Sequence, residues 1–374
     1  MKELLDILDA ADAFAARGQR LALATIVAVR GSTYRRAGAR LLLTAAQEMV
    51  GNISGGCLES DVMVVADEVM ASGTPRLVTY DLTADDDTVW GLGLGCNGAV
   101  DLFVEPLDPA SPQLRILREA LDGEQTVALV KLLDGPRVGR WMAVRPDGAV
   151  EGALGEAEVE ARATRAAQAA LTEGTSRLVA LPAAEGERRA FVEVIRPPLR
   201  LIVCGAGHDA IPVVRFASEI GWRVVVVDPR ERFLTAERFP GAREFVQASS
   251  EDAAARVPID DRTYVVVMTH NYLHDRDLLR GFLATPARYI GMLGPRQRTE
   301  KILDELRRQG VTVTARDRAR LFGPVGLDIG GEGPEAIALA LLAEIQAVEA
   351  GRQGGFLRER RGPIHETQTT SGRS

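Results

Sequence analysis

Residues 201–210 read LIVCGAGHDA and decide the fold of the C-terminal part of the chain. The first four, apolar residues predict a buried strand, and a glycine turn follows it at once. Residues 211–220 have helical spacing, and a second apolar run over 222–227 ends at Asp228. A strand, a glycine turn, a helix, a strand and an acid in this order are typical of a Rossmann βαβ unit. The sequence therefore predicts a Rossmann-like domain with a parallel sheet.

Four residues of this unit are candidates for contact with a nucleotide. Gly205 and Gly207 allow a tight turn and a close approach of the backbone to a pyrophosphate at the helix N-terminus. Asp228 would bind a ribose hydroxyl. His208 would either touch the ligand or cap the turn. Cys204 ends the first strand and is expected in the core.

Further parallel strands are predicted over 243–247 and 264–269, and residues 289–296 are expected to form a strand, a turn and the start of a helix. His270 and His274 follow the second of these strands in a predicted loop. In open α/β sheets ligands bind outside the carboxyl ends of the strands, so both histidines lie where a site is expected. The alternative is that they are polar surface, as most loop histidines are.

Near the N-terminus, residues 53–59 read ISGGCLE and combine two glycines, a thiol and a carboxylate. Cys57 lies before a helix predicted over 60–72, where backbone N–H groups favour negative charge and lower the pKa of a thiol. The alternative is that Cys57 is a small buried hydrophobic residue, as most free cysteines are. The residues expected to contact a ligand here are Gly55, Gly56, Cys57 and Glu59.

A second glycine-rich turn, residues 91–98, reads GLGLGCNG and contains Cys96. Four glycines free the backbone to approach a ligand closely. The acidic run over 85–87 precedes this turn, and we interpret it as a solvated turn or a helix N-terminus rather than a metal site. Because both cysteines lie in glycine-rich turns, the residues alone support a ligand site and a structural role about equally.

Residues 30–40 read RGSTYRRAGAR and form a predicted loop between strands over 21–29 and 41–44. Arginine forks next to hydroxyl groups suit a phosphate or another polyanion. The alternative is a solvated basic hairpin. The arginines concerned are Arg30, Arg35, Arg36 and Arg40.

The composition is that of a soluble globular protein. The chain has 374 residues, of which 46% are hydrophobic and 26% charged, so two or three domains are expected. A net charge of −7 argues against nucleic acid as the main partner. No apolar run reaches the roughly 18 residues that span a membrane, and the N-terminus has acids where a signal peptide is apolar. The three widely spaced cysteines fit a reducing cytoplasm.

The predicted class is α/β, in four parts. An N-terminal α/β domain with both glycine–cysteine turns covers 1–106, and a middle or linking region with no catalytic constellation covers 107–198. The Rossmann-like domain covers 199–350, and a disordered tail covers 351–374. We expect a ligand in the cleft between the two domains.

In combination these motifs resemble the xanthine dehydrogenase accessory factor family, written XdhC/CoxI. The middle region and the tail match nothing in the family pattern that we can name. The segments that carry the resemblance are GST at 31–33 with Arg35 and Arg36, SGGCLE at 54–59, LGLGC at 92–96, GAGH at 205–208, VDPR at 227–230, YIGMLG at 289–294, and GLDIG at 326–330 with Pro334 and Glu335.

The resemblance implies a maturation chaperone rather than a turnover enzyme. Such a protein binds and protects the molybdenum cofactor, a pterin with a dithiolene, a phosphate and the metal. It helps to exchange an oxo ligand for a terminal sulfide, with sulfur from a cysteine desulfurase. It then delivers the cofactor to an apo xanthine dehydrogenase or a related molybdenum hydroxylase in the cytoplasm.

For this chain our hypothesis is that Cys57 and Cys96 face the cofactor and protect or sulfurate its metal centre. The phosphate would be neutralised by Arg30, Arg35, Arg36 and Arg40. A homodimer is a further expectation, which no residue pattern carries. The competing hypotheses are an NAD(P)-dependent oxidoreductase that uses residues 199–348 and a nucleotide-sensing module. Against the enzyme, no Tyr-x-x-x-Lys pair follows the glycine turn.

Overall fold

The computed structural model describes residues 2–81, 98–123 and 125–361. Cys96 and the acidic run over 85–87 lie outside the described residues. The chain divides into two compact units, Glu3–Pro197 and Pro198–Arg360. Across the described ranges, no helix has the length and apolar character that a membrane crossing requires.

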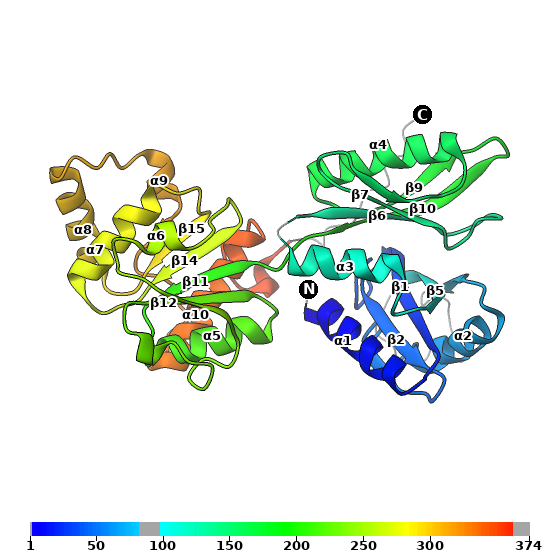
Figure 1. The fold of residues 1–374 in the computed structure, drawn as a ribbon, viewed down its shortest axis with the longest axis horizontal. Helices are drawn as coiled ribbons and strands as arrows, with labels where there is room; N and C mark the ends of the chain where they lie inside the picture. The colour runs from blue at the N-terminus through cyan, green and yellow to red at the C-terminus, as the bar shows by residue number, and fades with distance from the viewer. Residues whose placement is uncertain (1, 82–97, 124, 362–374) are drawn as a thin grey trace. The chain divides into compact units, whose positions relative to one another are not determined.

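The unit Pro198–Arg360 is built on a six-stranded parallel sheet (Figure 1), which confirms the predicted Rossmann-like domain. The strand order is β13-β12-β11-β14-β15-β16. From β11 the next strands in sequence are added on one side, and from β14 they are added on the other side. In the doubly wound fold the ligand crevice lies at this switch, between β11 and β14. The strands are β11 (Arg200–Cys204), β12 (Arg223–Asp228), β13 (Ala242–Gln247), β14 (Thr263–Val267), β15 (Tyr289–Met292) and β16 (Leu321–Phe322).

Helices cover both faces of this sheet (Figure 1), which is why its strands read as continuous apolar runs. Alternate residues of one strand serve the two cores: Leu201 and Val203 pack with α5 and α10, and Ile202 and Cys204 pack with α6, α7 and α8. The helices are α5 (Ala210–Glu219), α6 (Ala253–Arg256), α7 (Tyr272–Leu283), α8 (Arg296–Arg308), α9 (Ala315–Ala319) and α10 (Pro334–Glu349), with the short 3-10 helices η1 (Glu231–Phe233) and η2 (Leu357–Glu359).

Two details differ from the expectations. His274 lies on α7 rather than in a loop, because the Asn271 side chain accepts from the N–H groups of Leu273 and His274 and starts the helix there. The predicted tail is described as far as residue 361 and includes η2, while residues 362–374 lie outside the described part.

The unit Glu3–Pro197 contains two antiparallel five-stranded sheets. The first has the order β3-β2-β1-β5-β4, with α2 packed on one face and α1 on the other. Its elements are α1 (Lys2–Ala16), β1 (Leu21–Gly31), β2 (Arg40–Thr44), β3 (Met49–Gly51), α2 (Glu59–Ser72), β4 (Arg76–Asp81) and β5 (Gly98–Leu107).

The second sheet lies in the middle region, which therefore has a sheet and core of its own. Its order is β8-β7-β6-β10-β9, and α4 packs on one face. Ser111 and Pro112 begin a helix, α3, that the sequence analysis did not include. The elements are α3 (Pro112–Asp122), β6 (Val127–Leu132), β7 (Trp141–Val144), β8 (Val150–Gly152), α4 (Ala157–Glu173), β9 (Arg177–Pro182) and β10 (Glu187–Ile195).

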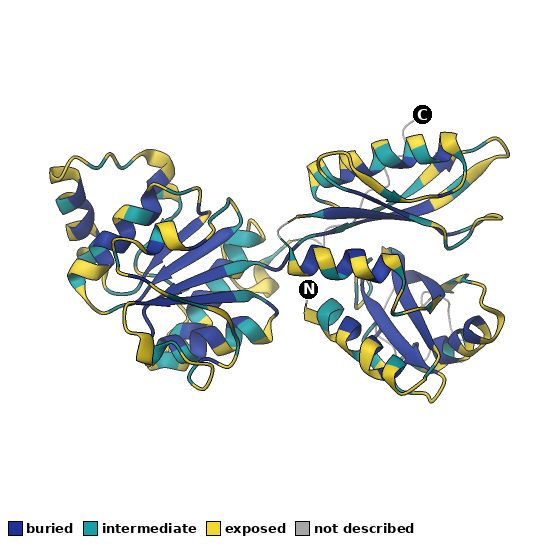
Figure 2. Cartoon of the chain, viewed as in Figure 1, coloured by how far each residue is buried: buried dark blue, intermediate teal, exposed yellow. Residues whose placement is uncertain are grey.

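The inner faces of these two sheets share a small apolar cluster that includes Phe103 and Phe191. Two buried ion pairs, Arg40–Glu193 and Lys131–Glu105, cross the same interface. Figure 2 shows the strands of both sheets as mainly buried. The packing of the two sheets thus combines apolar contacts with paired charges.

Candidate functional site

The loop over 52–58 leaves β3 and turns into α2. Gly55 (φ 84°) and Gly56 (φ 112°) both adopt left-handed backbone conformations, which other residues enter only with strain. Ile53 and Leu58 anchor the two ends of the loop in the core and are 2% and 1% exposed. The pair of glycines is therefore the exposed tip of a loop whose ends are fixed.

Cys57 lies on this tip, two residues before the first residue of α2. Its thiol is half-buried and is 3.6 Å from the backbone oxygen of Ser54, to which it can donate. The thiol therefore keeps an open side. Cys204, by contrast, is 1% exposed and belongs to the core, as predicted; burial and the nearby Asp275 and Asp228 carboxylates raise the pKa of its thiol.

Glu59 braces the loop from inside. Its carboxylate accepts hydrogen bonds from the Ser54 hydroxyl and from the backbone N–H groups of Ser54 and Leu58, the latter two at 3.1 Å. Burial acts to raise the pKa of Glu59, but these hydrogen bonds prevail and lower it below its ordinary value. The carboxylate predicted to contact a ligand thus contacts its own loop.

The loop over 32–38 lies beside the Cys57 loop. A Cβ at Gly55 would lie 3.5 Å from the ring of Tyr34, which is 61% exposed. At Gly98, where β5 begins, a Cβ would lie 2.4 Å from the backbone oxygen of Arg30. Cys96 is two residues before Gly98 in the sequence. The structure thus brings the loop over 32–38 next to the Gly55 tip, and the start of β5 next to Arg30.

The arginines of this region already have partners. Arg30 makes two hydrogen bonds to Asp101 at 2.8 and 2.9 Å, Arg35 pairs with Glu3, and Arg36 also has an interaction partner. The pair of Arg30 and Asp101 stabilises the charged form of both side chains. Burial acts to raise the pKa of Asp101, but its hydrogen bonds and the charge of Arg30 together outweigh this effect and lower the pKa. Arg40 was predicted in an anion-binding loop or a solvated hairpin, but it begins β2, is 6% exposed and pairs with Glu193 between the two sheets.

The glycine turn of the Rossmann-like domain has the predicted shape. A Cβ at Gly205 (φ 115°) would lie 2.7 Å from the backbone oxygen of Met268, so only glycine fits between β11 and β14. At Gly207 a Cβ would meet nothing within 4 Å. His208 beside it is exposed. Space for a ligand therefore lies at the second glycine.

Asp228 is occupied within the protein. Its carboxylate accepts from the Ala206 N–H at 2.7 Å and from Nε and Nη2 of Arg230 at 2.8 and 2.9 Å. Burial acts to raise the pKa of Asp228, but these hydrogen bonds prevail and lower it. The carboxylate braces the glycine turn, and a ribose hydroxyl would have to displace Arg230. A role in nucleotide binding stays a prediction.

A histidine–carboxylate contact crosses the crevice between β11 and β14. Nε2 of His270 is 2.9 Å from Oδ2 of Asp209. His270 has a left-handed backbone (φ 59°), which is rare for a residue with a side chain and marks local strain. His270 thus lies at the crevice, whereas His274 is exposed on α7.

Comparison with known proteins gives the family. Residues 201–345 match the XdhC Rossmann domain, and residues 14–81 and 120–181 match the XdhC and CoxI family. A probable xanthine dehydrogenase subunit of Bacillus subtilis (strain 168) is 30% identical over 344 residues, 89% of this chain and 94% of that protein. The chain belongs to the XdhC and CoxI family. The match over 120–181 includes most of the middle region, which the motifs did not connect with the family.

Two further relatives cover most of this XdhC and CoxI family member. The crystal structure of a xanthine dehydrogenase from Bacillus halodurans has a TM-score of 0.75 and 31% identity, over 93% of this chain and 97% of that one. The molybdenum cofactor insertion chaperone PaoD of Escherichia coli (strain K12) is 23% identical over 334 residues, 88% of this chain and 84% of PaoD. The relatives thus match both units.

Within the described residues of this family member, no three His, Cys, Asp or Glu side chains form a group that could hold a metal. Cys57 is described and Cys96 is not, so the predicted pair of molybdenum-facing thiols stays a prediction. A cavity of about 820 Å³ in the unit Glu3–Pro197, lined by Gln113 and Trp141 among others, was not predicted from the sequence. The signals available for it were the Ser-Pro start of α3 and the glycine-containing turn before Trp141.

Proposed function

We propose that the chain binds the molybdenum cofactor, protects it and inserts it into a molybdenum hydroxylase of the xanthine dehydrogenase type. The observation that carries the proposal is the braced loop with an accessible Cys57 thiol at its tip. Family membership supports it, because one relative is named a molybdenum cofactor insertion chaperone and another is named a probable part of a xanthine dehydrogenase.

The residues of this loop suit the cargo. A thiolate is a soft ligand that suits a metal already bound by sulfur. Gly55 and Gly56 leave the tip without side chains, so a bulky pterin can approach the backbone. The Arg35–Glu3 pair is partly exposed, with side chains 32% and 26% accessible, and such pairs are weak enough for a phosphate to replace the carboxylate.

Two finer steps belong to the proposal. A cysteine desulfurase partner, with a thiol reductant, supplies hydrogen sulfide; the sulfide replaces one oxo ligand, which leaves as water without net redox change. The loaded chain then contacts the apo-enzyme and releases the cofactor. Homodimer formation and a cytoplasmic location stay predictions.

The test is the cofactor content of the full chain after co-expression in a host that makes the molybdenum cofactor. Released pterin is oxidised and read by fluorescence, and molybdenum is counted by mass spectrometry. We expect near-stoichiometric pterin and metal in the wild type and a loss of most of both in Cys57→Ala. Cys204→Ala removes a core thiol far from the loop in sequence and is expected to keep its cargo.

Two results would contradict the proposal. A wild-type chain without pterin would overturn cofactor binding itself. Full cofactor content together with full activation of the target enzyme in Cys57→Ala would overturn the role of the thiol while leaving a chaperone in place.

The glycine turn at Gly205 supports a second candidate, an NAD(P)-dependent oxidoreductase or nucleotide sensor. The occupied Asp228 carboxylate argues against ordinary dinucleotide binding. Titration with NADH distinguishes the oxidoreductase from the nucleotide sensor. Only the enzyme would oxidise NADH with a carbonyl substrate, whereas the sensor would bind it without turnover.

A further inference from the structure

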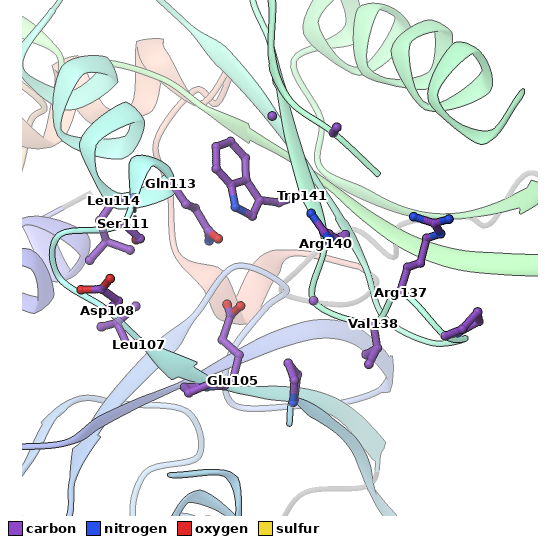
Figure 3. A pocket seen from close by; sticks show the side chains of 16 residues that line it. Glu105, Leu107, Asp108, Ser111, Gln113, Leu114, Arg137, Val138, Arg140 and Trp141 are labelled. Atoms are coloured by element: carbon purple, nitrogen blue, oxygen red, sulfur yellow. Dashed lines mark hydrogen bonds between the residues drawn. The ribbon is translucent and has the colours of Figure 1, made fainter. Parts of the chain in front are cut away.

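The cavity of about 820 Å³ lies beside the end of β5 (Figure 3). Its walls come from that strand end, the start of α3, the β6–β7 hairpin and the end of β8. The volume is within the range of about 300–1,000 Å³ that is usual for small-molecule sites. We call it the α3 cavity. None of the motif residues described above lines it.

Gln113 is an unpartnered amide directed into the α3 cavity (Figure 3). The residue lies in the first turn of α3 and is 8% exposed. Its side chain makes no hydrogen bond to any part of the chain that the structure describes. The amide atoms keep some exposure to the cavity, so water or a ligand there can complete their hydrogen bonds. Gln113 therefore offers a donor and an acceptor to a ligand.

Trp141 provides a flat wall. It starts β7, is half-buried, and packs with the apolar cluster around Leu114. A Cβ at Gly152 would lie 2.8 Å from the indole ring, so the ring is held close against the backbone of β8. An indole fixed at the wall of a cavity is a stacking surface for a flat heterocycle.

Charges of opposite sign lie on opposite sides of the α3 cavity. In Figure 3, Asp108 is on one side and Arg140 and Arg137 are on the other, with Trp141 and Gln113 between them in this view. Asp108 is exposed and accepts from the Ala110 N–H. Arg140 forms no ion pair with any described residue, whereas Arg137 is 3.6 Å from Glu156.

We propose that the α3 cavity binds a flat heterocycle with a 2-amino-lactam edge and an anionic group, the chemistry shared by guanine nucleotides and pterins. The ring stacks on Trp141, and its N–H groups donate to the Asp108 carboxylate. The Gln113 amide completes the hydrogen bonds of the ring, and Arg140 binds the anion.

This site is separate from the Cys57 loop. Cys57 precedes the N-terminus of α2, whereas Pro75, which lines the α3 cavity, follows its C-terminus. A helix of 14 residues is about 21 Å long. The two sites are therefore about the length of this helix apart, and binding in the α3 cavity does not require a cofactor at Cys57.

The test is calorimetric titration of the purified full chain with GMP and, in a separate arm, with pterin-6-carboxylate. We expect one saturable site for at least one of them, and binding at least tenfold weaker for AMP, which lacks the amino-lactam edge. The arm that binds identifies the source of the heterocycle. No saturable binding in either arm, or equal binding of AMP, overturns the inference.

Variants locate the binding. Gln113→Leu and Trp141→Leu are expected to weaken binding about tenfold or more, while Gln168→Leu, an exposed amide on α4, leaves it unchanged. Because Trp141→Leu also removes core packing, the exposed Arg140→Ala serves as a second test. In this variant GMP and guanosine should bind with equal affinity, because the side chain that binds the phosphate is gone. Unchanged GMP affinity in both Gln113→Leu and Arg140→Ala overturns the site.

Discussion

At the residue scale, polar side chains that were expected to face a ligand turn out to order their own loops. Glu59 accepts from Ser54, and Asp228 accepts from Ala206 and Arg230. A sequence pattern reports that a carboxylate is needed at a position. It does not report whether that carboxylate turns outward to a ligand or inward to backbone N–H groups, since both uses favour the same residue.

Glu59→Gln tests the bracing role. Removal of the charge weakens three hydrogen bonds in a partly buried loop, and we expect the free energy of unfolding at pH 7 to fall by about 1–2 kcal/mol. Glu68→Gln, on the exposed face of the same helix, should change it by less than about 0.5 kcal/mol. Urea unfolding measures both variants.

The bracing carboxylate also predicts a pH dependence. The pKa of Glu59 is lowered in the folded chain from an ordinary value of 4.5. Its contribution to stability is therefore full above the unfolded pKa and is lost as the pH falls through the folded pKa. Between pH 7 and pH 3 the wild type should lose more stability than Glu59→Gln. Parallel pH profiles for the two proteins would contradict the bracing role.

At the element scale, the turn after β11 separates two uses of glycine. Gly205 is required by packing, because a Cβ there would meet the backbone of Met268 at 2.7 Å. Gly207 has open space around it and no left-handed backbone, so nothing inside the protein requires a glycine there. In sequence the two glycines look alike, and only the position of β14 distinguishes them.

Gly205→Ala is expected to lower the free energy of unfolding by about 2–4 kcal/mol through strain and backbone overlap. Gly207→Ala should change it by less than about 0.5 kcal/mol. Thermal unfolding and circular dichroism measure both. A Gly205→Ala protein as stable as the wild type would mean that β11 and β14 are not this close in solution.

At the scale of the whole molecule, the two sheets of the unit Glu3–Pro197 meet across buried charges. The Arg40 and Glu193 side chains are 7% and 10% accessible, and Nε of Arg40 has no hydrogen-bond partner. Pairing across 153 residues cannot be read from either local pattern. Breaking one partner leaves the other charge buried and uncompensated.

Arg40→Met is therefore expected to lower the free energy of unfolding of this unit by about 3 kcal/mol. The double variant Arg40→Met with Glu193→Met removes both charges and should recover most of that loss. Denaturant unfolding, with hydrogen exchange to locate the change, gives the coupling between the two residues. Additive losses would show that the pair does not act as one unit.

The sequence by itself determined the elements whose signals are local. The glycine turn between two apolar strands specified the Rossmann-like unit, and the period of apolar residues specified most helices and strands, because propensity and periodicity act over a few neighbouring residues. The short edge strands β3 and β8 and the helices α3 and α7 were not predicted, although α3 and α7 begin at local capping residues, Ser111 and Asn271. The motifs also sufficed for the resemblance to the XdhC and CoxI family.

Only the tertiary structure decided which side chains are free. It buried Arg40 between two sheets, turned Glu59 and Asp228 toward backbone N–H groups, and left the Cys57 thiol accessible at a braced tip. It also assembled the α3 cavity from the end of β5, the start of α3 and the β6–β7 hairpin. Availability of a group depends on all neighbours in space, and the packing of sheets sets these neighbours.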